Sequence, residues 1–335
     1  MDACLASALR QGDAALARLH HCRPRNEGDA VRTLLRIHDL HLVGTDQLRG
    51  VERWQHHPAV AALKWELEQR FIARLDASDA AQEWQLPVDP VAAIRSIAAL
   101  DRIPRAYSWV ARHATVEGLV RFLALEGGPD GGFDDLVAIC QVGLRGGPKL
   151  ALARNYWDEM GRGDPSGVHS TLHDALVASL ELPTIPRHSQ PAAALDRAAL
   201  GSLLATNRWL QPEMLGALGL IELQAGPRSR QVVAGMERLG LPVEARTFYE
   251  EHATADPRHG KDWLDHVTAP LSSDPEMGRR MVRGARWRWT LNARFLEAAM
   301  EQLGVDRPAG DRVRTGSTVP ASSAVVRPDA PPVAA

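Results

Sequence analysis

The sequence has few of the residues that stabilise small secreted domains or build β-sheets. It has 3 cysteines among 335 residues, Cys4, Cys22 and Cys140, and no Cys-x-x-Cys spacing links them. We therefore expect neither a disulfide scaffold nor a thiolate metal cluster, and a reducing cytoplasm suits such a chain. β-branched and aromatic residues rarely alternate with polar ones, and aromatics make up only 5% of the chain, so few strands are expected.

No charge of one sign dominates, and no long apolar run occurs. The 39 Lys and Arg residues nearly balance the 41 Asp and Glu residues, so nothing draws the whole chain to nucleic acids or anionic membranes. The sequence lacks the run of about 18 apolar residues that marks a membrane span, and its N-terminus does not resemble a signal peptide. We expect a soluble, cytoplasmic protein. Walker loops, Rossmann glycine patterns and nucleophile elbows are also missing.

What the chain does contain is a helical pattern. Ala, Leu, Arg and Glu recur at spacings of three and four residues, which predicts an all-α fold. Prolines that follow polar residues, as in Asp164-Pro165 and Asp274-Pro275, mark helix starts, because a first-turn residue does not use its N–H. The expected helices span residues 2–19, 29–43, 58–76, 90–101, 104–126, 133–145, 148–160, 165–181, 196–207, 212–224, 227–239, 242–256, 257–268 and 275–303.

Composition divides the chain into three regions. Gln85-Leu86-Pro87 and Ile103-Pro104 interrupt the helical pattern and separate an N-terminal helical region, 1–100, from a domain over 101–305. After that domain the sequence turns to Pro, Ala, Ser, Thr and Val, a composition that cannot repay the entropy lost on ordering. We expect residues 306–335 to form a disordered tail.

The sharpest chemical signal is the segment His252-Ala-Thr-Ala-Asp256-Pro-Arg-His259. Residues at i, i+4 and i+7 share one helical face, so His252, Asp256 and His259 can aim three metal-binding side chains at one point. Pro257 can bend the axis without scattering them. A single histidine is more often a core or surface residue than a ligand, so the triplet needs partners before it predicts a metal site.

Suitable partners stand in two other segments. Glu159 and His169 flank a predicted helix break, each on the core-facing stripe of its helix, and Glu126 continues another such stripe. A buried carboxylate without a partner is costly, and a metal ion supplies the compensating charge. His173 lies one turn beyond His169 and competes with it, but the turn and the ten-residue spacing from Glu159 favour His169.

Together these residues form a set of three carboxylates and three imidazoles. Structural zinc takes four ligands rich in Cys and His, whereas inward-facing Glu, Asp and His from several helices suit a pair of iron or manganese ions. Two ferrous ions leave positive charge and coordination positions for dioxygen and a substrate. The sequence thus predicts a dinuclear centre with the ligands Glu126, Glu159, His169, His252, Asp256 and His259.

The order and spacing of this set resemble those of the haem-oxygenase-like dinuclear iron oxidases and oxygenases. The stretch Asn155-Tyr-Trp-Asp-Glu-Met-Gly-Arg-Gly-Asp164 is also very similar to sequences described as iron-containing redox enzymes. The resemblance covers about residues 105–303. It implies a haem-oxygenase-like helical bundle that uses two iron ions as cofactor and dioxygen as co-substrate.

The reaction that the resemblance implies depends on the family member. The iron pair activates dioxygen for N-oxygenation, desaturation, decarboxylation or carbon–carbon cleavage. Several members carry a histidine seven residues after the first glutamate, where this chain has Phe133, and the spacing of Glu159 and His169 is closer to that of members that oxidise nitrogen. The leading hypothesis is N-oxygenation of an amine or guanidine-like nitrogen of a small metabolite, in natural-product biosynthesis.

Two alternatives stay open. The same oxidant can desaturate or cleave an amino or fatty acid, and a helical binding protein can use the bundle pocket without redox chemistry. N-oxygenating relatives carry an additional helical region used for dimerisation, which implies that residues 1–100 serve a homodimer. A further implied partner is an external electron donor, such as a reductase.

Overall fold

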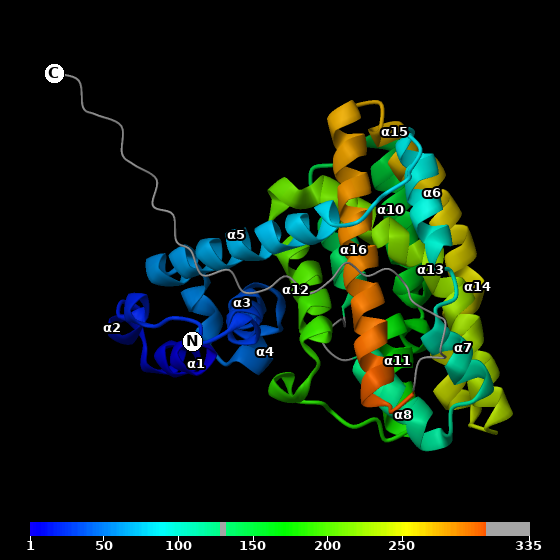
Figure 1. The fold of residues 1–335 in the computed structure, drawn as a ribbon, viewed down its shortest axis with the longest axis horizontal. Coiled ribbons are helices and arrows are strands. Elements are labelled where there is room, and N and C mark those ends of the chain that lie inside the picture. Colours follow the sequence, from blue (N-terminus) through cyan, green and yellow to red (C-terminus); the bar gives the residue numbers. More distant parts are fainter. Residues whose placement is uncertain (128–131, 306–335) are drawn as a thin grey trace.

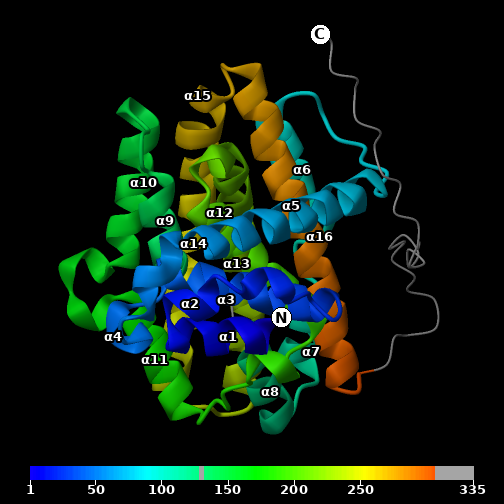
Figure 2. The same ribbon diagram turned by 90° about the vertical axis from the view of Figure 1, so that its left-hand side faces the viewer.

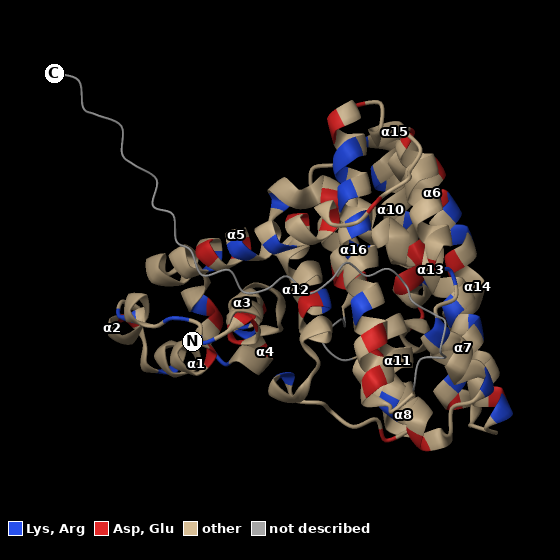
Figure 3. Cartoon of the chain, viewed as in Figure 1, with Lys and Arg blue, Asp and Glu red and all other residues tan. Residues whose placement is uncertain are grey.

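The computed structural model describes residues 1–127 and 132–305, and within these ranges the chain forms helices and no β-strand. The all-α prediction is confirmed. The predicted disordered tail, 306–335, lies outside the described residues. None of the described helices has the length and apolar character needed to cross a membrane. Charges of both signs are interspersed along the helices in Figure 3.

Helix α13 (Gln211–Arg238) is the central element of the bundle (Figure 1). It packs along its length against α14 (Val243–Trp263) and α16 (Pro275–Gln302). Most residues of α13 are buried, as expected for a helix enclosed by others. Its contact with α16 is very close, because a Cβ atom on Gly216 would lie 1.8 Å from Met281 O, and one on Gly284 would lie 1.9 Å from Glu213 O.

Both α13 and α14 continue through a proline. The helix ends predicted at residues 224 and 256 are therefore wrong: Pro227 lies inside α13 and Pro257 inside α14. A proline inside a helix costs roughly 3 kcal/mol, an amount that packing of the whole helix can outweigh. Here Gly226 faces Pro257, and a Cβ atom on Gly226 would lie 2.8 Å from Pro257 Cδ. The prolines thus lie where the two helices touch.

Other predicted helices are divided where a residue caps a new start. The segment expected as one helix over 104–126 forms α7 (Arg105–Arg112) and α8 (Val116–Glu126), and Thr115 Oγ1 accepts the Gly118 N–H at 3.1 Å. The segment over 2–19 turns at Gly12, which has a φ of 93°. The remaining helices around the bundle are α6 (Pro90–Leu100), α9 (Phe133–Cys140), α10 (Gly146–Glu159), α11 (His169–Ser179), α12 (Ala192–Thr206) and α15 (Ala269–Leu271).

The N-terminal helices form a layer that crosses the bundle helices (Figure 2). In this layer α3 packs on α12, and α5 contacts α16. The layer and the bundle share one apolar core, whose buried residues extend along the sequence from Met1 to Leu291. Arg74 of α5 pairs with Asp196 of α12 through two hydrogen bonds of 2.6 Å. The helices of the layer are α1 (Asp2–Gln11), α2 (Asp13–Leu16), α3 (Glu27–Leu42), α4 (Thr45–Leu48) and α5 (Pro58–Ala80).

A disulfide joins Cys4 and Cys22, while Cys140 is buried and free. Spacing along the sequence did not predict this pair. The chain reverses direction at Gly12, and this brings Cys4 of α1 opposite Cys22, which follows a short 3₁₀ turn. The pairing therefore depends on a tertiary reversal that cysteine spacing does not reveal.

Candidate metal centre

A sharp chain reversal brings Glu159 and His169 together. Glu159 is the last residue of α10, and His169 is the first residue of α11. Between them the chain turns back on itself, and Met160 pairs with Val168 as an isolated antiparallel bridge. Gly161 has a φ of 60°, and a Cβ atom there would lie 2.4 Å from the carbonyl carbon of Gly167. Only glycine fits this turn, which is why two helix ends can present their side chains to each other.

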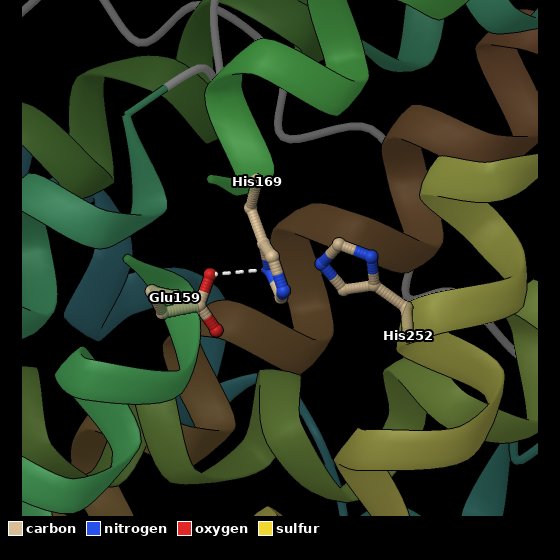
Figure 4. Close-up of side chains that lie close together, drawn as sticks. All are labelled: Glu159, His169 and His252. Carbon is tan, nitrogen blue, oxygen red and sulfur yellow. Dashed lines mark ion pairs between the residues drawn. The ribbon is translucent and has the colours of Figure 1, made fainter. Parts of the chain in front are cut away.

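Glu159, His169 and His252 form a first group of metal-binding side chains (Figure 4), and their ligand atoms all lie within 4.8 Å of one another. Glu159 Oε2 and His169 Nδ1 are 2.6 Å apart. The His252 Nδ1–H donates to Phe248 O at 2.7 Å, which leaves the Nε2 lone pair for a metal. Burial lowers the pKa of His252 to about 4, so this imidazole is neutral at pH 7.

A second group consists of Glu159, Glu222 and His259, whose ligand atoms also lie within 4.8 Å of one another. Glu222 comes from the middle of α13, is 2% exposed, and was not predicted as a ligand. Its Oε1 accepts the Asn155 Nδ2–H at 2.6 Å, and its Oε2 lies 3.6 Å from His259 Nδ1. Because Glu159 belongs to both groups, its carboxylate lies where it can bridge two ions.

Asp256 lies beside the second group. Its Oδ1 is 3.8 Å from His259 Nδ1, and the residue is 2% exposed. Burial raises the pKa of Asp256 well above its usual range, and the charges of Glu222 and Glu159 raise it further. Burial and neighbouring negative charges destabilise an ionised carboxylate in this position, so binding of a proton or a cation is favourable.

Two buried polar atoms here, Asp256 Oδ2 and His259 Nδ1, have no hydrogen-bond partner among the described residues, and His169 Nδ1 has only its ion pair with Glu159. Burying such atoms without a partner costs free energy, and burying several carboxylates together costs more. Metal ions would satisfy the lone pairs and neutralise the carboxylates at once. Mixed imidazole and carboxylate ligands suit iron, so the residues present fit a pair of iron ions.

Glu126, the sixth predicted ligand, has other partners. It ends α8, and its two carboxylate oxygens accept hydrogen bonds from the hydroxyls of Tyr107 and Tyr249. It belongs to neither group of converging ligand atoms. Burial raises the pKa values of both tyrosines, and the charge of Glu126 raises them further, so both hydroxyls remain donors. The structure thus brings four of the six predicted residues into the two groups and places Asp256 beside the second group, while the ligand role of Glu126 stays a prediction.

A cavity of about 310 Å³ adjoins the first group. Glu159, His169 and His252 form one part of its wall, and α13, α14 and α16 supply much of the rest. Glu126 lies on this wall as well. His173, the competitor of His169, also lines the cavity and packs edge-on against Phe248, with ring centroids 5.3 Å apart. The cavity therefore gives a small molecule direct access to the candidate metal centre.

The sequence around Glu222 contains a feature that could have identified it as a ligand. It is the one charged residue in the apolar run Met214-Leu-Gly-Ala-Leu-Gly-Leu-Ile-Glu-Leu223. A lone carboxylate inside such a run has to find a partner in the core. The helix end predicted at residue 224 placed Glu222 in a last turn, where a glutamate can reach solvent.

Iron binding to this centre is expected to release protons. Burial works against protonation of His259, but the carboxylates of Glu222 and Asp158 outweigh it and raise its pKa to about 9. At pH 7 the metal-free protein therefore carries a proton on His259 that a metal must displace. We expect anaerobic addition of ferrous iron at pH 7, followed by pH-stat titration, to release at least about one proton per chain, and iron affinity to rise from pH 6 to 8.

The proton release expected for a histidine with an ordinary pKa is the reference for this measurement. With a pKa near 6.5, it would release only about a quarter of a proton at pH 7. A release well below one proton per chain, with an affinity that stays flat over the same pH range, would mean that iron does not bind His259.

Comparison with known proteins adds one finding. Residues 120–293, slightly more than half of the chain, match the model of a protein family described as iron-containing redox enzyme. The match includes both groups of converging side chains and most of the cavity wall. The chain matches no curated protein.

Proposed function

The chain belongs to the family of iron-containing redox enzymes, and we propose that it is a non-haem diiron oxygenase that oxidises an amine or guanidine-like nitrogen of a small metabolite. The observation that carries the proposal is the pair of ligand groups that share Glu159 beside the cavity. The buried atoms Asp256 Oδ2 and His259 Nδ1, which have no hydrogen-bond partner among the described residues, support the presence of metal in the working protein.

In this proposal each iron ion has its own histidines. Glu159, His169 and His252 would hold one ion, and Glu222, Asp256 and His259 the other. These residues would hold a ferrous pair whose chemistry would be the activation of dioxygen. Asn155, which donates to Glu222, and Phe248, whose carbonyl accepts from His252, orient the ligands.

The cavity wall favours a cationic nitrogen near this centre. The carboxylates of Glu126, Glu159 and Asp174 line the cavity, so part of its wall is negatively charged although arginines line it as well. An ammonium or guanidinium group is attracted into such a space. Ile221 and Phe248 add apolar wall that limits water around the reacting nitrogen.

The reaction balances as a four-electron reduction of dioxygen, in which two electrons come from the substrate nitrogen and two from an external donor. One oxygen atom is inserted into an N–H bond and gives an N–OH group. The other leaves as water, after taking up two electrons and two protons. An external donor, such as a reductase, must supply these electrons for each turnover. We also propose a homodimer, to which the N-terminal layer would contribute.

The test is anaerobic reconstitution followed by exposure to isotopically labelled dioxygen. We expect the parent protein to take up about two ferrous ions per chain. With reductant and a panel of small amines and guanidines, it should give a product that carries one labelled oxygen on nitrogen. Products that have lost hydrogen or carbon would instead indicate desaturation or carbon–carbon cleavage. Failure to take up iron would favour the alternative hypothesis, a helical binding protein without redox chemistry.

A further inference from the structure

Arg228 is a buried cation on the cavity wall, opposite in charge to most of the groups near the metal site. It stands on α13 and is 8% exposed. Its Nη2–H donates to the Asp101 main-chain oxygen at 3.1 Å, and its Nε has no hydrogen-bond partner. Its guanidinium carbon lies 5.6 Å from the centroid of the Tyr107 ring. No carboxylate of the described residues forms an ion pair with it.

Other arginines show how this fold usually pairs a guanidinium. Arg74 forms two hydrogen bonds with Asp196, and Arg187 forms two with Asp39, although both arginines are more exposed than Arg228. A guanidinium keeps its charge even when buried, and its planar fork matches a carboxylate. Arg228 therefore lacks the anion that its chemistry calls for, and the cavity is where that anion can enter.

Polar side chains around Arg228 suit an anion of this kind. Gln224 lies one turn earlier on the same helix, and Asn292 lines the cavity from α16. Arg288 contributes a further guanidinium to the same wall. Amide N–H groups and guanidinium N–H groups are the donors that recognise a carboxylate.

Arg228 and the first metal-binding group line the same cavity. Helix α13 contributes Ile221, Gln224 and Arg228 to its wall, and Glu159, His169 and His252 line another part of it. Tyr107 links the two kinds of charge, because its hydroxyl donates to Glu126 and its ring lies beside Arg228. Carboxylates and the Arg228 guanidinium thus line one cavity, which can take a molecule that carries both a cationic and an anionic group.

We propose that Arg228 binds a carboxylate of the substrate, so that the enzyme acts on an amino acid whose reactive nitrogen is separated from that carboxylate by a short chain. The inference rests on the proposed function, since it names the substrate class for the same cavity. Arg228 is a binding residue here and takes no part in the oxidation. Its role is to fix which end of the molecule faces the metal centre.

The test compares amines with and without a carboxylate. The probes are L-lysine against cadaverine, L-arginine against agmatine, and L-ornithine against putrescine, measured by calorimetry on the anaerobic iron-loaded protein. Charge-assisted hydrogen bonds contribute roughly 1.5–3 kcal/mol, so at least one amino acid should bind about 10- to 100-fold more tightly than its decarboxylated partner. Inorganic phosphate, as a further probe, should bind more weakly than that amino acid.

Arg228→Gln should reduce this preference to less than about 3-fold. Arg230→Gln is the matched control, because Arg230 lies two residues away on the same helix and is exposed. Arg228→Lys keeps the charge without the fork and should retain a smaller preference. Circular dichroism and iron uptake by Arg228→Gln at the parent level would show that its fold and metal centre are intact.

Repeating the binding measurement on metal-free protein separates this inference from the proposed function. A preference that persists without iron and disappears in Arg228→Gln supports the carboxylate site, whatever the iron chemistry turns out to be. The inference is overturned if no pair is discriminated by the parent, if Arg228→Gln keeps the preference, if phosphate binds best, or if the preference requires iron and so reflects ligation of the metal.

Discussion

Glu222→Gln is expected to weaken iron binding by at least about 100-fold, whereas Glu126→Ala should still take up about two ferrous ions per chain. Even residues that only orient ligands contribute about 10- to 100-fold to metal affinity, so a ligand contributes more. In the structure Glu222 is one of the converging side chains, whereas the Glu126 carboxylate accepts hydrogen bonds from two tyrosine hydroxyls. Anaerobic equilibrium dialysis against ferrous iron measures both variants.

A matched pair of histidine variants completes this experiment. His252→Ala should lose iron, while His266→Ala should not, because the His266 side chain is 53% exposed and lies 4.0 Å from its nearest carboxylate, that of Asp262. Metal-free Glu222→Gln should be no less stable than the metal-free parent, because the change removes one of several buried like charges. If Glu126→Ala loses iron and Glu222→Gln retains it, the six-residue set predicted from the sequence is correct instead.

A large loss of stability is expected from Gly284→Ala. A Cβ atom there would lie 1.9 Å from Glu213 O, and the clashing atom belongs to the backbone of α13. A rotamer change cannot relieve such a contact, so the two central helices have to move apart. Overpacked cores lose about 1–3 kcal/mol and occasionally more, and we expect Gly284→Ala to lose about 3 kcal/mol or more. Urea unfolding of the metal-free protein measures the loss.

Gly147→Ala is the control for this prediction. Gly147 also lies in a helix, but a Cβ atom there would meet nothing within 4 Å. Gly147 stands in the first turn of its helix and directly before Pro148, where alanine gains little, so Gly147→Ala should change the free energy of unfolding by less than about 1 kcal/mol. A Gly284→Ala protein that unfolds at the same urea concentration as the parent would mean that α13 and α16 are not this close.

Local geometry explains which parts of the candidate site could be predicted. His252, Asp256 and His259 lie on one face of α14, so the period of the helix alone predicts that their side chains point the same way. Glu159 and His169 flank a turn that their glycines mark. These features lie within a few residues of each other, and the sequence contains them in full.

The remaining features depend on contacts between distant segments. Tyr249, which donates a hydrogen bond to Glu126, lies 123 residues from it in the sequence. The position of Glu126 at a helix end does not predict this partner. Glu222 was missed because the pattern ended its helix at residue 224, and the continuation of α13 past Pro227 depends on its packing against α14 and α16. The Cys4–Cys22 disulfide likewise depends on a chain reversal. Periodicity predicts elements, and packing decides how far each one extends.

Helix α12 lies between the two regions that composition separates. Asp196 pairs with Arg74 of the N-terminal layer, and the next residue, Arg197, lines the cavity and donates to the main-chain oxygen of Glu126. One step along the backbone thus connects the outer layer to the wall around the substrate. If that layer forms a dimer interface, association of two chains acts on the same helix that shapes the cavity, so assembly and substrate selection share a structural element.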